Sequence, residues 1–247
     1  MSTNSSDEVK NNLLSLSNIN QSIWNLDLIV SYYHFLKEKN LQGGFFSNSE
    51  EEHILTRHVY ESMIHVEKLA EKISISRETK IADVGTGPGL PGFLFLCLKE
   101  RPNVTLIDSQ QKRLKLLYEF TREVKIRLEV IYERAELIHK KFQLATMRSV
   151  VPYPWSIEIV SKLVSNNGYF APFLAKRNYP IEFEEKFLTQ FGFEIFEDFQ
   201  ITELKFLGER HIKLLKKKAI VEQSFVRPWA VIQKEIREYN GKNNFNQ

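Results

Sequence analysis

The fold is decided by the stretch Lys80-Ile81-Ala82-Asp83-Val84-Gly85-Thr86-Gly87-Pro88-Gly89-Leu90-Pro91-Gly92. A short apolar run ends at an acidic residue and is followed by a turn with glycine at alternate positions, as where a buried parallel strand leads into a nucleotide-binding helix. Glycine accepts a positive φ, and its missing side chain lets a ligand lie against backbone N–H groups. The stretch therefore predicts a ligand-binding loop, with Pro91 in the first turn of a helix that runs from Phe93 to Arg101.

Two cofactors fit these glycines. The pattern Gly87-x-Gly89-x-x-Gly92 matches a dinucleotide fingerprint, and Asp108 follows the next predicted strand, where a carboxylate can bind a ribose. Asp83, two residues before Gly85, gives instead the D-x-G-x-G-x-G pattern typical of enzymes that bind S-adenosylmethionine (SAM), and the two prolines of the loop favour that choice. Two other interpretations stay open: a turn that binds nothing, and Asp108 as the cap of a helix that begins at Ser109.

Length and composition exclude several classes of protein. The chain has 247 residues, 43% hydrophobic and 26% charged, which suits one large domain or a domain with an appendage. We find no apolar run near the length of a membrane span and no signal peptide. The single cysteine, Cys97, cannot form an internal disulfide, which fits a reducing cytoplasm. We therefore expect a cytoplasmic protein, with a monomer as the working assumption.

The chain divides into three predicted parts: a helical extension at 1–79, a SAM-methyltransferase domain at 80–218 and a tail at 219–247. Alternating strand and helix patterns predict a doubly wound, Rossmann-like α/β sheet whose last two strands form an antiparallel hairpin. In the tail, we expect a short surface helix followed by a disordered end. The seven strands are predicted at 80–84, 104–108, 128–132, 142–147, 168–174, 193–199 and 210–216.

Two helices are predicted in the extension. Residues 1 to about 20 are rich in Ser and Asn and are expected to be weakly ordered. One helix occupies 19–40, and a second opens at Ser49, which forms a capping box with Glu52, and ends near residue 73. On this second helix Arg57 and Glu61 are four residues apart, which is the spacing of a solvated ion pair.

Basic residues and absences bear on the substrate. Two stretches of the chain are rich in Lys and Arg, and we call them the cationic stripes. They suggest contact with phosphate groups, although solvation alone also accounts for each of them. No cysteine nucleophile, metal-ligand cluster or Asn/Asp-Pro-Pro-aromatic turn is found, so methylation of pyrimidine carbon or of exocyclic amines is not indicated. The stripes comprise Lys112, Arg113, Lys115, Arg122, Lys125 and Arg127, and then Lys205, Arg210, Lys213, Lys216, Lys217 and Lys218.

Four motifs resemble one known family in order and spacing, over about residues 50 to 217. The family is the bacterial rRNA small-subunit methyltransferase G family (RsmG, also called GidB), and Arg57-His58 with Ser62 also resembles its N-terminal helix motif. The resemblance implies transfer of a methyl group from SAM to N7 of a guanine in 16S rRNA of the small ribosomal subunit. The motifs are Asp83 to Gly92, Ile107-Asp108-Ser109 with Lys112-Arg113, Arg134-Ala135-Glu136, and Gly208-Glu209-Arg210-His211.

The resemblance also implies roles for single residues. We assign catalysis to the cationic groups Arg148 and Lys176 at the ends of two strands, although a structural ion pair is the competing role for Arg148. Substrate binding is assigned to Arg57, His58, Arg113 and Arg210. SAM contacts are implied at Gly85, Leu90, Ala135, Glu136 and Arg148, and the loop and ribose arguments add Asp83, Gly87, Gly89 and Asp108.

The departures from the family pattern lie on the substrate side. The chain has Met147-Arg148-Ser149 for Ser-Arg-Ala, Ala175-Lys176-Arg177 for Leu-Lys-Gly, Glu61 for an Asp, and Asn40-Leu41-Gln42-Gly43 for a motif beginning Asn-Leu-Thr. They keep alternatives open: a relative that methylates another RNA or a small molecule, a nicotinamide oxidoreductase, or a module that binds SAM or the ribosome without catalysis.

Overall fold

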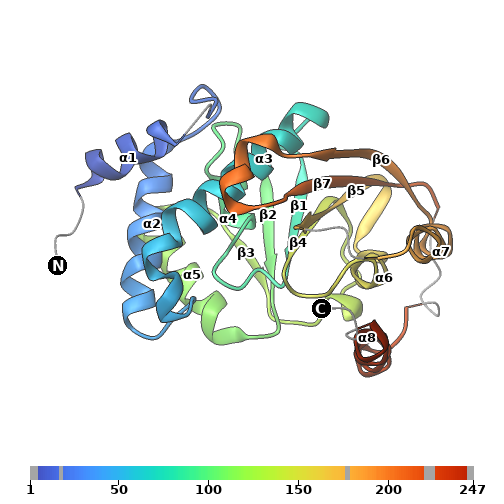
Figure 1. The fold of residues 1–247 in the computed structure, drawn as a ribbon. Helices are drawn as coiled ribbons and strands as arrows, with labels where there is room; N and C mark the ends of the chain where they lie inside the picture. Colours follow the sequence, from blue (N-terminus) through green and yellow to red (C-terminus); the bar gives the residue numbers. More distant parts are fainter. Residues whose placement is uncertain (1–4, 17–18, 176–178, 220–225, 244–247) are drawn as a thin grey trace.

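A seven-stranded sheet forms the centre of the molecule (Figure 1). The structure is a computed structural model that describes residues 5–16, 19–175, 179–219 and 226–243. The strand order is β3-β2-β1-β4-β5-β7-β6, and the first five strands are parallel. The strands are β1 (Lys80–Val84), β2 (Asn103–Ile107), β3 (Glu129–Ile131), β4 (Phe142–Arg148), β5 (Val164–Leu174), β6 (Phe193–Gln200) and β7 (His211–Lys217).

The doubly wound sheet predicted from the sequence is confirmed, including the antiparallel pairing of β6 with β7. Within this hairpin β6 is the edge strand, and β7 lies between β5 and β6 and pairs antiparallel with both. Its central position explains why all its side chains except that of Lys216 are buried.

Helices cover both faces of the sheet (Figure 1). One apolar cluster joins α1 to α5 to one face, and a second joins α6, α7 and α8 to the other. Residues of β1 alternate between the clusters, as expected for a strand buried on both faces: Ile81 belongs to the first, Ala82 and Val84 to the second. The helices are α1 (Ser6–Ser15), α2 (Leu26–Leu41), α3 (Glu61–Lys72), α4 (Gly92–Leu96), α5 (Gln111–Glu123), α6 (Trp155–Val160), α7 (Ile181–Phe191) and α8 (Trp229–Asn243).

The N-terminal extension and the first sheet helix correct three expectations. Residues 6–15 form α1, because Ser5 caps its first turn and Val9 and Leu13 are fully buried. The helix predicted at 19–40 begins only at Leu26, where the side chain of Asn25 accepts the N–H of Leu28. The first sheet helix, α4, is also shorter than predicted and ends at residue 96.

The capping box at Ser49 is not formed. Instead the chain passes through a 3₁₀ turn η1 (Asn48–His53) and a π-helical stretch η2 (Ile54–Tyr60) before α3 begins. The Ser49 hydroxyl bonds that of Ser47, at 2.9 Å. Because a π-helix bonds residues five apart, residues at i and i+4 no longer align, and Arg57 pairs with Glu50 at 2.8 Å instead of Glu61.

The tail is also more extensively packed than predicted. Its helix α8 has 15 residues, and Ile232 and Ile236 are buried against α6 and α7. The helix extends to Asn243, and residues 244–247, which belong to the end expected to be disordered, lie outside the described residues. No helix in the described ranges is long and apolar enough to span a membrane.

Candidate functional site

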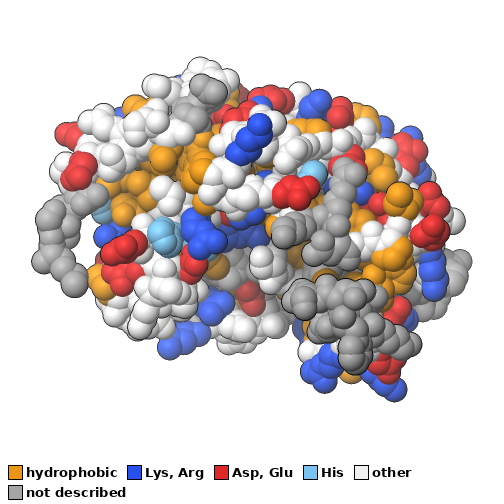
Figure 2. All heavy atoms as spheres, in the orientation of Figure 1, with side chains coloured by type: hydrophobic (Ala, Val, Ile, Leu, Met, Phe, Trp, Pro, Cys, Tyr) orange, Lys and Arg blue, Asp and Glu red, His pale blue; other side chains and the backbone are white. Residues whose placement is uncertain are grey.

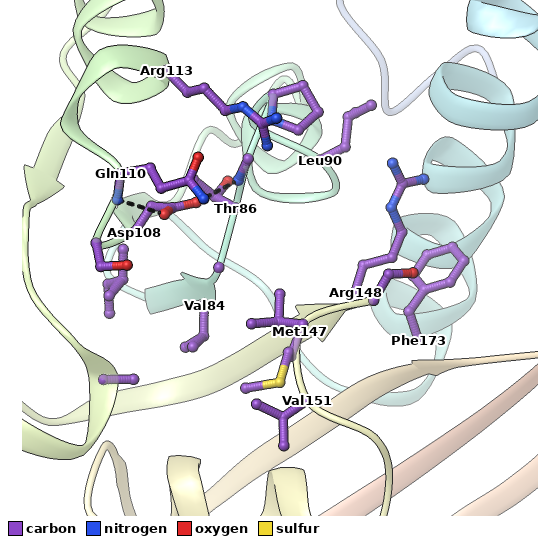
Figure 3. Close-up of a pocket in the computed structure, with 18 of the residues that line it drawn as sticks. Val84, Thr86, Leu90, Asp108, Gln110, Arg113, Met147, Arg148, Val151 and Phe173 are labelled. Atoms are coloured by element: carbon purple, nitrogen blue, oxygen red, sulfur yellow. Dashed lines mark hydrogen bonds between the residues drawn. The ribbon is translucent and has the colours of Figure 1, made fainter. Parts of the chain in front are cut away.

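A cavity of about 690 Å³ opens where β1, β2 and β4 end (Figure 3). Its volume falls in the range of small-molecule sites, roughly 300 to 1,000 Å³. The lining comes from the turn after β1, from the residues after β2, β3 and β4, and from η2, α3 and β5. This is the crevice in which doubly wound sheets bind their ligands.

The turn after β1 is held from below by Asp83. Its Oδ2 accepts hydrogen bonds from the Thr86 hydroxyl at 2.5 Å and from the Gly92 N–H at 2.9 Å. Burial raises the pKa of Asp83 to about 7, against the lowering effect of these bonds. The prediction that Asp83 contacts the cofactor is not supported by this geometry, since its side chain lies beneath the loop and does not line the cavity. Asp83 therefore belongs to the sequence pattern because its side chain holds the loop together.

Two of the predicted glycines face the cavity. Gly85 has φ +65°, and a Cβ there would lie 2.2 Å from the side chain of Val150, so glycine is strongly favoured at this position. Gly87 donates its N–H to Asp108 at 3.0 Å. Gly89, predicted as a third contact, does not line the cavity; it packs against Tyr32 and Leu117. Leu90, the last predicted contact of the loop, does line it.

The predicted ribose and adenine positions lie together on one side of the cavity. Asp108 accepts the N–H of Gly87 and that of Gln110, the latter at 2.8 Å, so it lines the cavity and also holds the chain that enters α5 (Figure 3). The helix α5 begins at Gln111 with Gln110 as its N-cap, so Asp108 is not the cap of a helix beginning at Ser109, and its contact with a ribose stays a prediction. Ala135 and Glu136, in the turn η3 (Ala135–Leu137), line the same side, and Glu136 pairs with Arg134 at 2.7 Å.

Arg148 lies on the other side of the cavity, in what we call the Arg148 cluster: Glu61, Arg148 and Arg210. Glu61 is 6% exposed; it accepts a hydrogen bond from Arg210 Nε and lies 3.7 Å from Arg148. The guanidinium of Arg148 also sits 5.7 Å from the centre of the Phe173 ring (Figure 3). Figure 2 shows Lys and Arg side chains gathered in a hollow near the middle of this face.

His58 completes this side. Its ring stacks on Phe46, 4.2 Å between centres, and bonds Glu50 and Arg148 at 3.1 and 3.5 Å. Burial, followed by the charge of Arg148, lowers the pKa of His58 to about 4, so this histidine is neutral near pH 7. Phe46, Phe173 and Glu61 were not predicted as site residues; the aromatic pair after Gly43-Gly44 was the sequence signal available for Phe46.

The other predicted substrate residues have different positions. Arg113 lines the cavity above the glycine turn (Figure 3). Arg57 does not: its side chain is half exposed and turned to Glu50. Lys176, predicted as catalytic, and Arg177 lie outside the described residues.

The second cationic stripe does not form a single phosphate-binding surface, because Arg210 lines the cavity whereas Lys213 and Lys217 are buried. Lys213 is 2% exposed and pairs with Glu184 and Asp198, a group that we call the Lys213 cluster. Lys217 is equally buried and donates to the carbonyl of Phe191; burial, then Lys141, lowers the pKa of its amine to about 7. Both lysines are buried because α7, which carries Glu184 and Phe191, covers this face of β7. Among the described residues, no group of three His, Cys, Asp or Glu side chains is placed to hold a metal ion.

The fold and this cavity define the class: a SAM-dependent methyltransferase of the doubly wound type. Solved structures with this fold include a mutant of MtNAS in complex with SAM (TM-score 0.56, 13% identity, 86% of this chain and 89% of that one). Another is magnesium protoporphyrin IX methyltransferase from Synechocystis with bound SAM (TM-score 0.55, 15% identity, 75% and 91%). At such identities the likeness concerns the fold.

The sequence identifies the family. The family model described as rRNA small subunit methyltransferase G matches residues 25–212. A relative of that name from Leptospira biflexa is 45% identical, covering 87% of this chain and 89% of its own, and one from Leptospira interrogans is 42% identical, covering 90% and 87%. The chain belongs to the rRNA small subunit methyltransferase G family, and its cofactor is SAM.

Proposed function

We propose that this protein transfers a methyl group from SAM to N7 of a guanine in 16S rRNA, acting on the small ribosomal subunit in the cytoplasm. The observation that carries the proposal is the arrangement of the cavity. One side has the glycine turn, Asp108 and η3, and the other has two guanidinium groups around a single carboxylate. The relatives named above supply the rRNA as substrate class.

The first side fits SAM on its own geometry. Gly85 and Gly87 leave the turn without side chains, and Asp108 presents a carboxylate to a ribose. Ala135 and Glu136 lie where the adenine edge would be contacted, and Leu90 closes the inner wall. When bound, SAM supplies a methyl group on a positively charged sulfur. We assign these residues to cofactor binding.

The Arg148 side of the cavity fits a guanine base, which is a neutral nucleophile, within an anionic RNA chain. Guanine N7 carries a lone pair and no proton, so its attack on a sulfonium methyl needs no general base. The residues must then hold the base in line and bind its O6 and the nearby phosphates. Arg148 and Arg210 are the donors that we assign to this work, because one carboxylate neutralises only one of them. The neutral His58 adds an aromatic surface, and Lys176 stays a predicted second catalytic cation.

Nucleoside mass spectrometry tests the proposal. Small subunits from cells that lack this modification are incubated with the protein and SAM, and the 16S rRNA is digested. New 7-methylguanosine is the expected product. Its absence from subunits and from naked 16S rRNA, with SAM bound in calorimetry, would reject the substrate and favour another RNA, a small molecule or a non-catalytic role. Binding of NAD in place of SAM would reject the cofactor as well.

A further inference from the structure

The cofactor cavity receives one residue from outside the region that the family model matches. That match ends at residue 212, whereas α8 begins at Trp229. Trp229 lines the cavity, on the same side as Arg134, Ala135 and Glu136. The motifs that identify the family do not include an aromatic side chain at this position.

The helix that carries Trp229 is firmly attached. Arg227, just before it, forms a bidentate ion pair with Glu158 of α6, whose side chain is fully buried, and a second pair with Glu235 at 2.6 Å. Burial of one partner makes such a pair rigid, since breaking it leaves an uncompensated charge. The start of α8 is therefore fixed relative to α6, which itself borders the cavity through Ile159.

Apolar contacts fix the rest of the helix. Ile232 is fully buried, and the ring of Tyr239 stacks on Phe183 of α7, with 5.3 Å between centres and 5° between planes. Tyr239 also meets Trp155 edge to face at 5.1 Å. These contacts leave Trp229 little freedom to move away from the cavity, as Figure 1 illustrates by the position of α8 beside α6.

The position of Trp229 along the cavity indicates which part of the ligand it meets. The sheet order places the end of β3 two strands away from β1, on the side opposite β4 and β5. Trp229 lies with the residues that follow β3, and its ring is 5.5 Å from the guanidinium of Arg134. The Arg148 cluster lies at the other end, beside β4 and β5. Trp229 is thus at the adenosine end, away from the methyl acceptor.

We propose that Trp229 is a cofactor-binding residue, which packs its indole against the adenine of SAM and completes the site from the appended C-terminal helix. Aromatic side chains bind nucleobases through their faces, and such contacts contribute substantially to affinity. The inference rests on SAM as the cofactor and does not depend on which nucleotide accepts the methyl group. It gives a function to the segment that follows β7.

Calorimetry on the full chain tests this. Trp229→Ala should weaken binding of SAM and of S-adenosylhomocysteine by the same factor, about tenfold, because the two ligands share the adenosine. The matched control is Val231→Ala, two residues along α8, whose side chain is 48% exposed and does not line the cavity; its affinity should equal that of the wild type. Unchanged affinity in Trp229→Ala would overturn the inference, and a wild-type chain that binds no SAM would overturn the cofactor as well.

A second measurement keeps the question decidable if Trp229→Ala loosens α8. Tryptophan fluorescence of the wild type is compared with that of Trp229→Phe, each with and without SAM. We expect the change on adding SAM to be largely lost in Trp229→Phe, since the two remaining tryptophans, Trp24 and Trp155, are both buried and do not line the cavity. An identical change in both proteins would show that the indole does not meet the ligand.

Discussion

Two clusters of buried charge have opposite compositions. The Arg148 cluster holds two guanidinium groups and one carboxylate, and it borders the cavity. The Lys213 cluster holds one ammonium group and two carboxylates, and the rings of Tyr153 and Tyr179 lie 5.5 Å from its amine. The first has positive charge in excess beside an open space. The Lys213 cluster is enclosed by side chains and has no excess positive charge for a ligand.

Burial of a cation therefore does not by itself mark a binding site. Burial lowers the pKa of Lys213, but the hydrogen bond to Glu184 and the nearby negative charges outweigh it, and the net shift is upward. For Arg148 the burial effect on the pKa prevails over the carboxylate of Glu61, and the net shift is downward. The lysine is satisfied within the fold, whereas the arginine is left with capacity to bind a further negative or electron-rich group.

Removing the amine of Lys213 should give the largest effect, and this effect should be confined to the stability of the fold. In Lys213→Met, Glu184 remains buried with the Tyr153 hydroxyl but without its cation, so the free energy of unfolding should fall by about 3–5 kcal/mol. Chemical denaturation measures it. Lys218→Met, which removes a surface pair with Glu194, is the control and should cost at most about 1 kcal/mol. Equal losses in the two variants would erase the contrast between the clusters.

Removing the arginine should affect transfer instead. Arg148→Ala should reduce kcat about 100-fold, since a donor to the reacting base is lost. The melting temperature should change little because Glu61 keeps its bond to Arg210. Single-turnover methylation of 16S rRNA measures the effect, with Arg77→Ala, an exposed residue before β1, as the control. Full activity together with a large loss of stability would make Arg148 a structural residue like Lys213.

Changing the carboxylate between the two arginines should give a smaller effect. Glu61→Gln removes the charge that positions both guanidinium groups, and transfer should fall about tenfold while SAM affinity stays unchanged. Glu61→Asp keeps the charge and should restore most of the activity. If the amide and the shorter acid behave alike, the negative charge at this position is not what orients Arg148.

The smallest effect concerns pH. His65 is fully buried, its ring lies 4.1 Å from that of Phe173, and neither ring nitrogen has a hydrogen-bond partner among the described residues. Burial, then Arg148, lowers the pKa of His65 from its usual 6.5 to about 3. The unfolded chain therefore binds a proton that the folded chain does not, and stability falls as pH drops below 6.5.

Replacing this histidine isolates its contribution. Between pH 8 and pH 6, His65→Leu should gain about 1 kcal/mol of unfolding free energy relative to the wild type. Denaturation at the two pH values measures the difference. Arg148→Ala should differ from the wild type much less than His65→Leu does in how stability changes between pH 8 and pH 6. The reason is that burial, not Arg148, is the larger cause of the lowered pKa of His65. A difference that does not vary with pH would mean that His65 is protonated in the folded protein.

Local sequence patterns were enough to predict the sheet and part of the cavity wall. Strand periodicity and the glycine turn act over a few residues, so Gly85, Gly87 and Asp108 could be predicted near the ligand from local pattern, whereas Leu90 came from the family resemblance. Local pattern identifies a loop without saying which of its side chains point inward, and Asp83, predicted as a cofactor contact, lies beneath the loop.

Only the tertiary structure decided the rest. The pairing of Glu61 with Arg210 joins residues 149 positions apart, and the entry of Trp229 into the cavity depends on how α8 docks on α6 and α7. The burial of Lys213 depends on α7 packing over β7, which brings Glu184 to its amine. Charge along a chain looks the same whether it faces water or a carboxylate, because the desolvation and ion pairing that distinguish the two arise only when distant segments pack together.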